Sequence, residues 1–120
     1  MSTTRPELTT HVLDTARGRP GAGMRVDLAR VERDGSVRHV KTMTTDANGR
    51  ALMLPEGEMT AGTYQLTFHV ADYHRAAGVP IATPPYLDQI PVRFSIADAT
   101  THYHVPLLVA PWSYTTYRGS

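Results

Sequence analysis

Apolar residues recur at every second position along much of this chain, and this period constrains the fold more than any other feature. In residues 24–33, Met24, Val26 and Leu28 alternate with polar or small residues, and residues 63–70 repeat the pattern. Successive side chains of a β-strand point to opposite faces of its sheet, so each segment presents one apolar face. The chain is therefore expected to bury strands, not helices.

Turn signals separate about eight such segments. Asp34-Gly35 follows residues 24–33 and predicts an antiparallel hairpin with residues 37–45. The expected strands are 8–15, 24–33, 37–45, 51–54, 63–70, 92–97, 102–109 and 113–117. Many short strands with regular turns are typical of an all-β sandwich. Residues 71–78 lose the alternation and end in Gly78, which predicts one short helix.

The composition narrows the class of protein. A chain of 120 residues with 41% hydrophobic and 19% charged residues predicts a single folded domain. The net charge is only +1 and the arginines are scattered, so neither a nucleic-acid partner nor a membrane surface is expected. The sequence has no cysteine, which excludes disulfides and thiolate chemistry. Residues 1–10 lack the apolar core of a secretory signal, so a cytoplasmic location is expected.

Histidines mark one strand face. His102 and His104 are two residues apart, so both leave the same face of their strand, opposite Tyr103. Pro106 follows on that face and has no N–H to donate, which predicts an edge or an irregularity there. His11 lies in residues 8–15, and three imidazoles would converge if the two strands were neighbours.

Three interpretations of these histidines remain open from the residues alone. Histidines bind zinc, although structural sites usually have four patterned ligands and catalytic sites often add a carboxylate. A histidine is also the side chain best suited to general acid or base catalysis at neutral pH. Alternatively, they are solvent-facing strand residues without a functional role, which is the interpretation that we adopt for His39 and His74.

Arg50 follows the turn formed by residues 46–49, where a strand is expected to begin. It is either an ordinary surface charge or a guanidinium that clamps a carbonyl or an anionic heterocycle with two hydrogen bonds. The sequence contains no GxSxG elbow or comparable nucleophile motif. Covalent catalysis therefore has no positive support.

Three motifs together resemble the transthyretin-related 5-hydroxyisourate hydrolase family. They are HVLDTARGRPGAG at 11–23, TDANGR at 45–50, and HYHVPLLVAPWSYTTYRGS at 102–120, whose final YRGS is a signature of that family. The resemblance extends from Leu8 to Ser120. It implies a hydrolase domain at 8–120 preceded by a flexible segment at 1–7.

The resemblance also implies an architecture and a site. The fold would be a transthyretin-like sandwich of two four-stranded sheets with one short helix, assembled as a homotetramer whose active sites form at the dimer–dimer contact. The residues that match the family's catalytic positions are His11, Arg50, His104 and Tyr117, and Ser120 would join His11, Arg50 and Tyr117 in binding the substrate. No cofactor or metal is implied. His102 receives no role beyond support.

The implied reaction is hydrolysis of 5-hydroxyisourate to 2-oxo-4-hydroxy-4-carboxy-5-ureidoimidazoline in urate breakdown. In this interpretation His104, assisted by His11, removes a proton from water, and Arg50 stabilises the developing negative charge. The rival is a non-catalytic small-molecule binder like transthyretin, since a fold does not settle a function. Transthyretin lacks the histidines, the turn arginine and the YRGS ending that this sequence contains.

Overall fold

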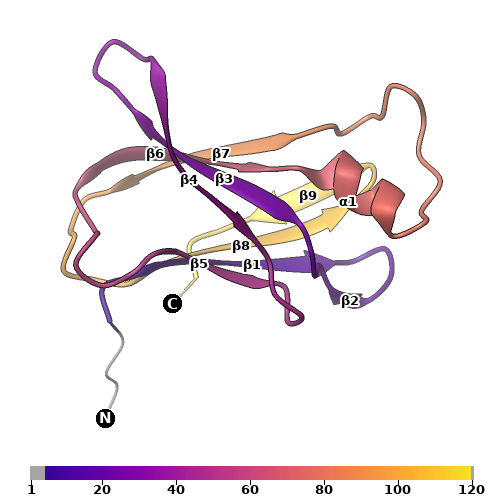
Figure 1. Ribbon diagram of the computed structural model, residues 1–120, viewed down its shortest axis with the longest axis horizontal. Helices are drawn as coiled ribbons and strands as arrows, with labels where there is room; N and C mark the ends of the chain where they lie inside the picture. Colours follow the sequence, from indigo (N-terminus) through magenta and orange to yellow (C-terminus); the bar gives the residue numbers. More distant parts are fainter. Residues whose placement is uncertain (1–4, 120) are drawn as a thin grey trace.

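The alternating segments form strands in the computed structural model, which describes residues 5–119 (Figure 1). In chain order the elements are β1 (Leu8–Asp14), β2 (Arg19–Pro20), β3 (Arg25–Val31), β4 (Val37–Thr44), β5 (Arg50–Leu54), β6 (Gly62–Phe68), α1 (Val70–Ala76), β7 (Ile90–Ile96), β8 (Tyr103–Ala110) and β9 (Ser113–Thr116). The predicted all-β sandwich with one short helix is confirmed. None of the helices in the described part of the chain has the length and apolar character needed to cross a membrane.

Two sheets form the sandwich. One has the order β4-β3-β6-β7, with every neighbouring pair antiparallel. In the other sheet, β8 lies between β1 and β9 and is parallel to β1. The opposite edge of β1 pairs antiparallel with β5 and β2. The prediction of four strands per sheet missed β2. This two-residue strand occupies the stretch of β1 beyond β5, where Leu13 is opposite Pro20.

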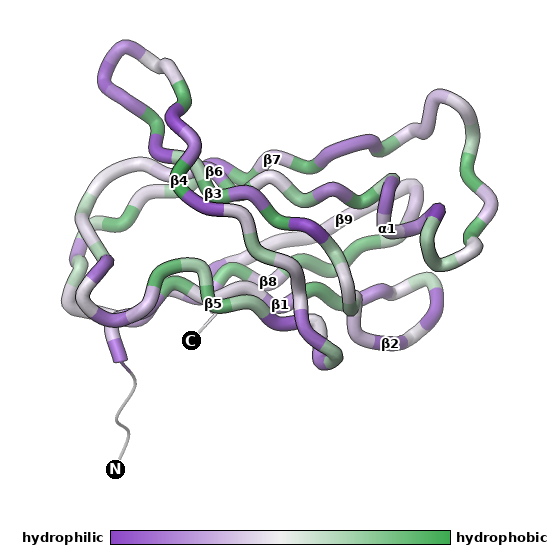
Figure 2. Tube along the Cα trace, in the orientation of Figure 1, coloured by the Kyte–Doolittle hydropathy of each residue, from purple (hydrophilic) through white to green (hydrophobic). Residues whose placement is uncertain are grey.

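The core lies between the two sheets and comes from the predicted apolar faces. Figure 2 shows hydrophobic stretches along the paired strands and a hydrophilic β3–β4 hairpin tip. Val12, Leu28, Leu66, Phe68 and Leu107 have no exposed side-chain surface. Full burial of each such side chain contributes roughly 1.5–3 kcal/mol, so strand register is set by this face.

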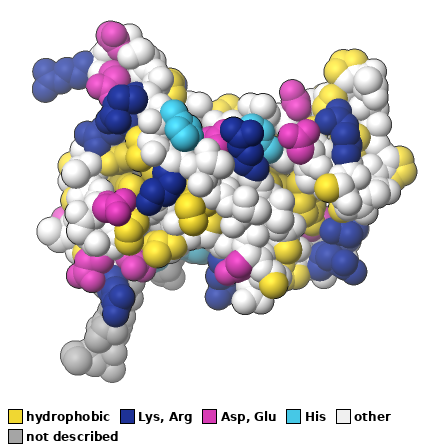
Figure 3. Space-filling model, in the orientation of Figure 1, with side chains coloured by type: hydrophobic (Ala, Val, Ile, Leu, Met, Phe, Trp, Pro, Cys, Tyr) yellow, Lys and Arg dark blue, Asp and Glu magenta, His cyan; other side chains and the backbone are white. Residues whose placement is uncertain are grey.

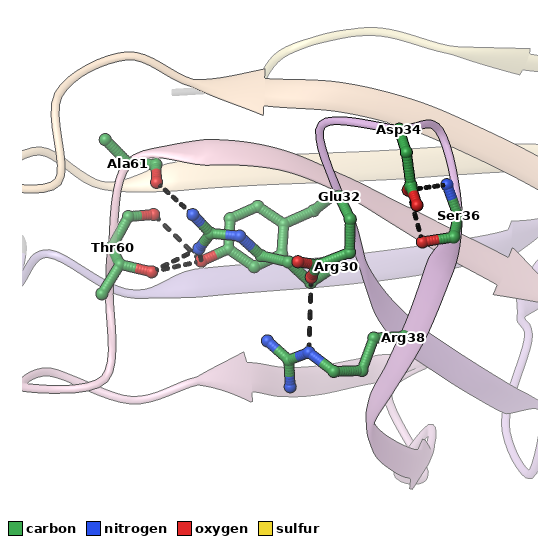
Figure 4. Close-up of polar contacts among 8 residues, drawn as sticks. Arg30, Glu32, Asp34, Ser36, Arg38, Thr60 and Ala61 are labelled. Atoms are coloured by element: carbon green, nitrogen blue, oxygen red, sulfur yellow. Dashed lines mark hydrogen bonds and ion pairs between the residues drawn. The ribbon is translucent and has the colours of Figure 1, made fainter.

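The β3–β4 hairpin turns at Asp34-Gly35, as predicted. The Asp34 carboxylate accepts hydrogen bonds from the backbone N–H and hydroxyl of Ser36 (Figure 4). Gly35 has φ of 87°, a conformation that residues with a Cβ rarely adopt. Near the base of the hairpin, Arg30 donates to Thr60 Oγ1 and the Ala61 carbonyl (Figure 4). These contacts hold the β5–β6 loop against β3.

The helix α1 closes one end of the sandwich. It begins at Val70, one residue earlier than predicted, and the chain leaves it through Gly78, whose φ is 77°. Tyr73 is buried and donates its hydroxyl hydrogen to Asp14 Oδ2 at 2.7 Å. Arg17 binds the same carboxylate oxygen at 3.0 Å. This hydrogen-bond network fixes the helix to the end of β1.

The outward face of the β4-β3-β6-β7 sheet is polar. Figure 3 shows basic, acidic and histidine side chains intermingled over β3 and β4. Asp27 lies at the centre of one such group, because it accepts hydrogen bonds from Thr42, His69 and Arg25. The polar groups of these residues are hydrogen-bonded to Asp27, so we expect the group to stabilise the fold and not to take part in catalysis.

Candidate active site

The outward face of the other sheet brings three of the expected site residues together. His11 on β1 is opposite Arg50 on β5, and Thr9, two residues before His11, is opposite His104 on β8. Cross-strand partners share a face of the sheet, and residues two apart do the same. His11, Arg50 and His104 therefore lie on one surface, as the sequence led us to expect for the two histidines.

Pro106 does not mark an edge strand, because β8 has a neighbour on each side. It does lie beside an irregularity in the pairing of β8. Regular pairing with β9 begins only at Leu107, and on the other side of Pro106 the end of the chain contacts β8 through a single isolated bridge between His104 and Gly119. Pro106 itself is paired with His11 in the parallel β1–β8 ladder, and its carbonyl accepts a hydrogen bond from Thr116 Oγ1.

A hollow of about 540 Å³ lies over this face. Volumes of 300–1,000 Å³ are typical of small-molecule sites. The wall combines histidines, an arginine, hydroxyls and one exposed leucine, with the lining residues Thr9, Thr10, Met43, Thr44, Asp46, Arg50, Ala51, Leu52, His102 and His104. Such a wall suits a polar heterocycle better than a purely apolar ligand.

Arg50 is positioned by the turn that precedes it. The Asp46 carboxylate accepts hydrogen bonds from the backbone N–H groups of Asn48 and Arg50, and the Gly49 carbonyl accepts one from Val12. The turn is thereby fixed to β1. Among the described residues, no carboxylate forms an ion pair with the Arg50 guanidinium, so its five donors are available to a ligand.

His11 and His104 have different hydrogen-bond partners. His11 Nε2 lies 2.9 Å from the Asn48 carbonyl oxygen, which can only accept, so Nε2 carries the hydrogen. In neutral His11 the lone pair is then on Nδ1. His104 Nδ1 lies 2.7 Å from Thr9 Oγ1. The rings of His102 and His104 stack with their centroids 6.2 Å apart.

The local environment lowers the pKa of His104. Partial burial is the main cause, and the positive charges or potential charges of His102, His11 and Arg50 add to it. Burial and nearby cations both disfavour the imidazolium form. His104 is consequently neutral at pH 7 and able to accept a proton, which is the state required of a general base.

Tyr117 is not among the residues that line the hollow of Arg50 and His104. It lines a second hollow of about 360 Å³ together with Phe94, Tyr103 and Arg118, and its side chain is 56% exposed. The Arg118 guanidinium stacks on the Tyr103 ring, 4.1 Å from its centroid. The structure thus places Arg50 and His104 in one hollow and His11 on the same sheet face, whereas Tyr117 lines a different hollow. Ser120 lies outside the described residues.

Sequence reasoning missed several residues of this site, and two of them contact His104 directly. Thr9 shares the His11 face and touches both His102 and His104, a relationship that the period of two already contained. Gly119 packs against the His104 ring, and no local pattern predicted that contact. Within residues 5–119 no group of three or more His, Asp or Glu residues is arranged to hold a metal ion.

Known proteins resemble this chain over nearly its whole length. The family model described as HIUase/Transthyretin matches residues 8–119. The chain belongs to that family. A protein of Rhizobium meliloti named 5-hydroxyisourate hydrolase 2 is 54% identical over 117 residues, which cover 94% of this chain and 95% of the relative.

Solved structures of family members superpose on the same fold. The Klebsiella pneumoniae 5-hydroxyisourate hydrolase matches with a TM-score of 0.78 and 32% identity, covering 95% of this chain and 99% of that one. An (S)-allantoin synthase matches with a TM-score of 0.89 and 42% identity over 98% of this chain. This chain spans 44% of the synthase's length.

Proposed function

We propose that this family member hydrolyses 5-hydroxyisourate to 2-oxo-4-hydroxy-4-carboxy-5-ureidoimidazoline, a step of urate catabolism. The observation that carries the proposal is the shared hollow of His104 and Arg50, which places a neutral imidazole beside a guanidinium that forms no ion pair within residues 5–119. The high identity to the Rhizobium meliloti hydrolase supports the same activity.

The residues of the hollow supply the chemistry of water addition to a cyclic acyl C–N bond. His104 accepts a proton from water as the oxygen attacks the carbonyl carbon, and His11 lies on the same face to assist. Negative charge then develops on the carbonyl oxygen, where Arg50 donates hydrogen bonds. One donor of this kind is worth roughly a hundredfold to a thousandfold in kcat. The tetrahedral intermediate then collapses: the acyl C–N bond breaks, protonated His104 returns its proton to the leaving ring nitrogen, and the ring opens to a carboxylate.

The non-catalytic alternative, a carrier like transthyretin, has weaker support. A carrier needs shape and apolar contact, whereas this hollow contains a neutral imidazole and the Arg50 guanidinium, which has no ion-pair partner in the described part of the chain. Tyr117 and Ser120 remain proposed substrate-binding residues. The absence of a cofactor, the cytoplasmic location and the domain division after residue 7 also stay predictions.

We further propose that the active unit is a homotetramer. The hollow is open on its outer side, and Leu52 in its wall is 40% exposed. A second copy facing this sheet would cover Leu52, exclude water and bring further side chains, such as Tyr117 of another protomer, to the site. Exposed apolar residues at the rim of a polar hollow are typical of interaction surfaces.

Decay of 5-hydroxyisourate, produced in situ from urate by urate oxidase and followed by absorbance, tests the activity. Native protein should accelerate the decay and His104→Ala should lose most of that acceleration. His39→Ala is the matched control, because His39 lies on β4 in the opposite sheet. Equal decay with native protein and without protein would rule out the hydrolase and favour the carrier.

A further inference from the structure

Three polar side chains form a continuous hydrogen-bonded row at the hollow. Thr9 Oγ1 lies 3.2 Å from His102 Nε2 and 2.7 Å from His104 Nδ1. Thr9 is on β1, His104 is its cross-strand partner on β8, and His102 immediately precedes that strand. The threonine hydroxyl is therefore the only link between the two imidazoles in this row.

At one end of the row, a backbone carbonyl determines which atoms donate and which accept. His102 Nδ1 lies 3.2 Å from the Arg5 carbonyl oxygen. A carbonyl oxygen only accepts, so His102 Nδ1 must carry the hydrogen. In neutral His102 the other ring nitrogen, Nε2, then has a lone pair and accepts the hydrogen of the Thr9 hydroxyl.

The Thr9 hydroxyl in turn determines which atom donates in its hydrogen bond with His104. A threonine hydroxyl has one hydrogen, which is already given to His102, so Thr9 Oγ1 can only accept from His104 Nδ1. His104 is thereby the Nδ1–H tautomer with its lone pair on Nε2. No hydrogen-bond partner of that nitrogen is found among the described residues, and the His104 side chain lines the hollow.

We propose that Thr9 and His102 are positioning residues that hold His104 in the Nδ1–H tautomer and so keep a lone pair on Nε2, the nitrogen free to take a proton. The role of His104 as a base rests on the proposed hydrolase function, whereas the tautomer assignment rests on the hydrogen bonds alone. A neutral imidazole in the opposite tautomer would present an N–H at the hollow and could not act as a base there. A wrong histidine tautomer is costly in other hydrolases for the same reason.

The nitrogen NMR spectrum of the native protein tests the tautomer directly. Uniformly ¹⁵N-labelled protein, above the pH at which its histidines are protonated, should show His104 Nδ1 as a protonated nitrogen and Nε2 as an unprotonated one. His102 should show the same pattern. A protonated Nε2 in His104 would overturn the proposal, whatever the activity of the protein.

Two variants separate the roles of the row. Thr9→Val is nearly isosteric and removes the link, so the His104 Nδ1–H tautomer should lose its dominance. His102→Leu removes the acceptor and leaves the Thr9 hydroxyl free to donate to His104 Nδ1, so the His104 tautomer should shift toward Nε2–H. An unchanged His104 spectrum in both variants would overturn the proposal.

Kinetics give a second readout. In metal sites, loss of the hydrogen-bond partner that orients a ligating histidine costs roughly tenfold to a hundredfold. We expect a fall of similar size in kcat for Thr9→Val, with little change in KM. Thr9→Ser should restore kcat, because serine keeps the hydroxyl. Thr63→Val is the matched control, since the Thr63 hydroxyl contacts Ser95 on the other sheet. An equal loss of kcat in Thr9→Ser and Thr9→Val would contradict a role for the hydroxyl.

These measurements distinguish failure of the inference from failure of the proposed function. Native protein that leaves 5-hydroxyisourate decay unchanged would overturn the hydrolase, while the nitrogen spectrum would still decide the tautomer. Rapid hydrolysis by a protein with the opposite His104 tautomer would retain the hydrolase and overturn the positioning role of Thr9 and His102.

Discussion

Gly119 lies against the ring of His104 so closely that a Cβ added at position 119 would be 2.6 Å from His104 Cδ2. The backbone N–H of Gly119 also donates to the His104 carbonyl at 2.8 Å. The glycine of the terminal YRGS motif is thus a packing partner of the proposed base. Any side chain at this position must displace either the chain ending or the imidazole.

Gly119→Ala is therefore expected to reduce kcat/KM by about tenfold or more, because a shift of the His104 ring or of the chain ending beside it misplaces a catalytic group. The melting temperature should stay nearly unchanged, because this local shift leaves the core between the sheets intact. Activity assay and thermal unfolding of the variant check this. Gly35→Ala is the complementary control: with φ of 87° in an open turn it should lose stability and keep its activity. Full activity in Gly119→Ala would contradict the importance of the contact.

Arg50→Gln should lower kcat by roughly a hundredfold, because one donor to the developing oxyanion is lost. It should also raise the pKa of His104, since burial remains but one cation that disfavours the imidazolium is gone. The acidic limb of kcat/KM, which reports protonation of the free enzyme's base, should move to higher pH with it. NMR titration of His104 measures the pKa shift, and Arg33→Gln in the β3–β4 hairpin is the control. An unchanged His104 pKa would show that Arg50 does not act on it.

Leu52→Glu should weaken the proposed tetramer. Copies meeting through this face would bring like charges together at a position now 40% exposed and apolar. Light scattering should report a smaller assembly, and hydrolase activity should fall with it. Val40→Glu is the control, because Val40 is comparably exposed on β4 of the other sheet. A native protein that is monomeric at assay concentrations would exclude the tetramer.

Asp27→Asn should remove a stabilising charge on the opposite sheet. Burial alone would raise the pKa of Asp27, but hydrogen bonds from Thr42, His69 and Arg25 outweigh it and lower the pKa to about 2. A carboxylate whose pKa falls from 3.8 to this value contributes about 2 kcal/mol at neutral pH. Because the pKa is depressed on folding, that contribution is complete above about pH 4 and disappears as the pH falls to about 2.

Urea unfolding at neutral and acidic pH tests this prediction for Asp27. Native protein and Asp27→Asn should differ at pH 7 and converge near pH 2. Asp88→Asn, which changes an exposed carboxylate, should resemble the native protein throughout. A difference between native protein and Asp27→Asn that persists unchanged at pH 2 would refute the charge-based explanation.

His74→Leu should reduce the sensitivity of the fold to mild acid. The His74 side chain is 1% exposed, and neither ring nitrogen has a partner among the described residues. Burial lowers its pKa, aided by Arg17 and opposed by Asp14. The folded state therefore resists protonation, while the unfolded state binds the proton near the ordinary value of 6.5. The free energy of unfolding therefore decreases as the pH falls below 6.5, because protonation of His74 favours the unfolded state.

The unfolding free energy measured at pH 7.5 and pH 5.5 decides this second acid effect. The decrease between the two values should be smaller in His74→Leu than in the native protein. His39→Leu, at an exposed position, should retain the native decrease. A larger decrease in His74→Leu would show that His74 forms a favourable interaction when protonated.

The sequence by itself determined the strands, their apolar faces, the turns at Asp34-Gly35 and Asp46–Gly49, and the family. These features depend on neighbouring residues: a period of two assigns each side chain to a face, and glycine permits the positive φ of a turn. The shared face of His11 and Leu13, or of His102 and His104, follows from the same local rule.

Only the tertiary structure decided how these faces meet. The parallel pairing of β1 with β8 places Thr9 beside His104, 95 residues away, and the returning chain places Gly119 on the same ring. Which strands become neighbours depends on how their apolar faces pack across the whole core, which no local window of sequence contains. The burial of His74, the short strand β2 and the placement of Tyr117 in a different hollow from Arg50 and His104 arise in the same way.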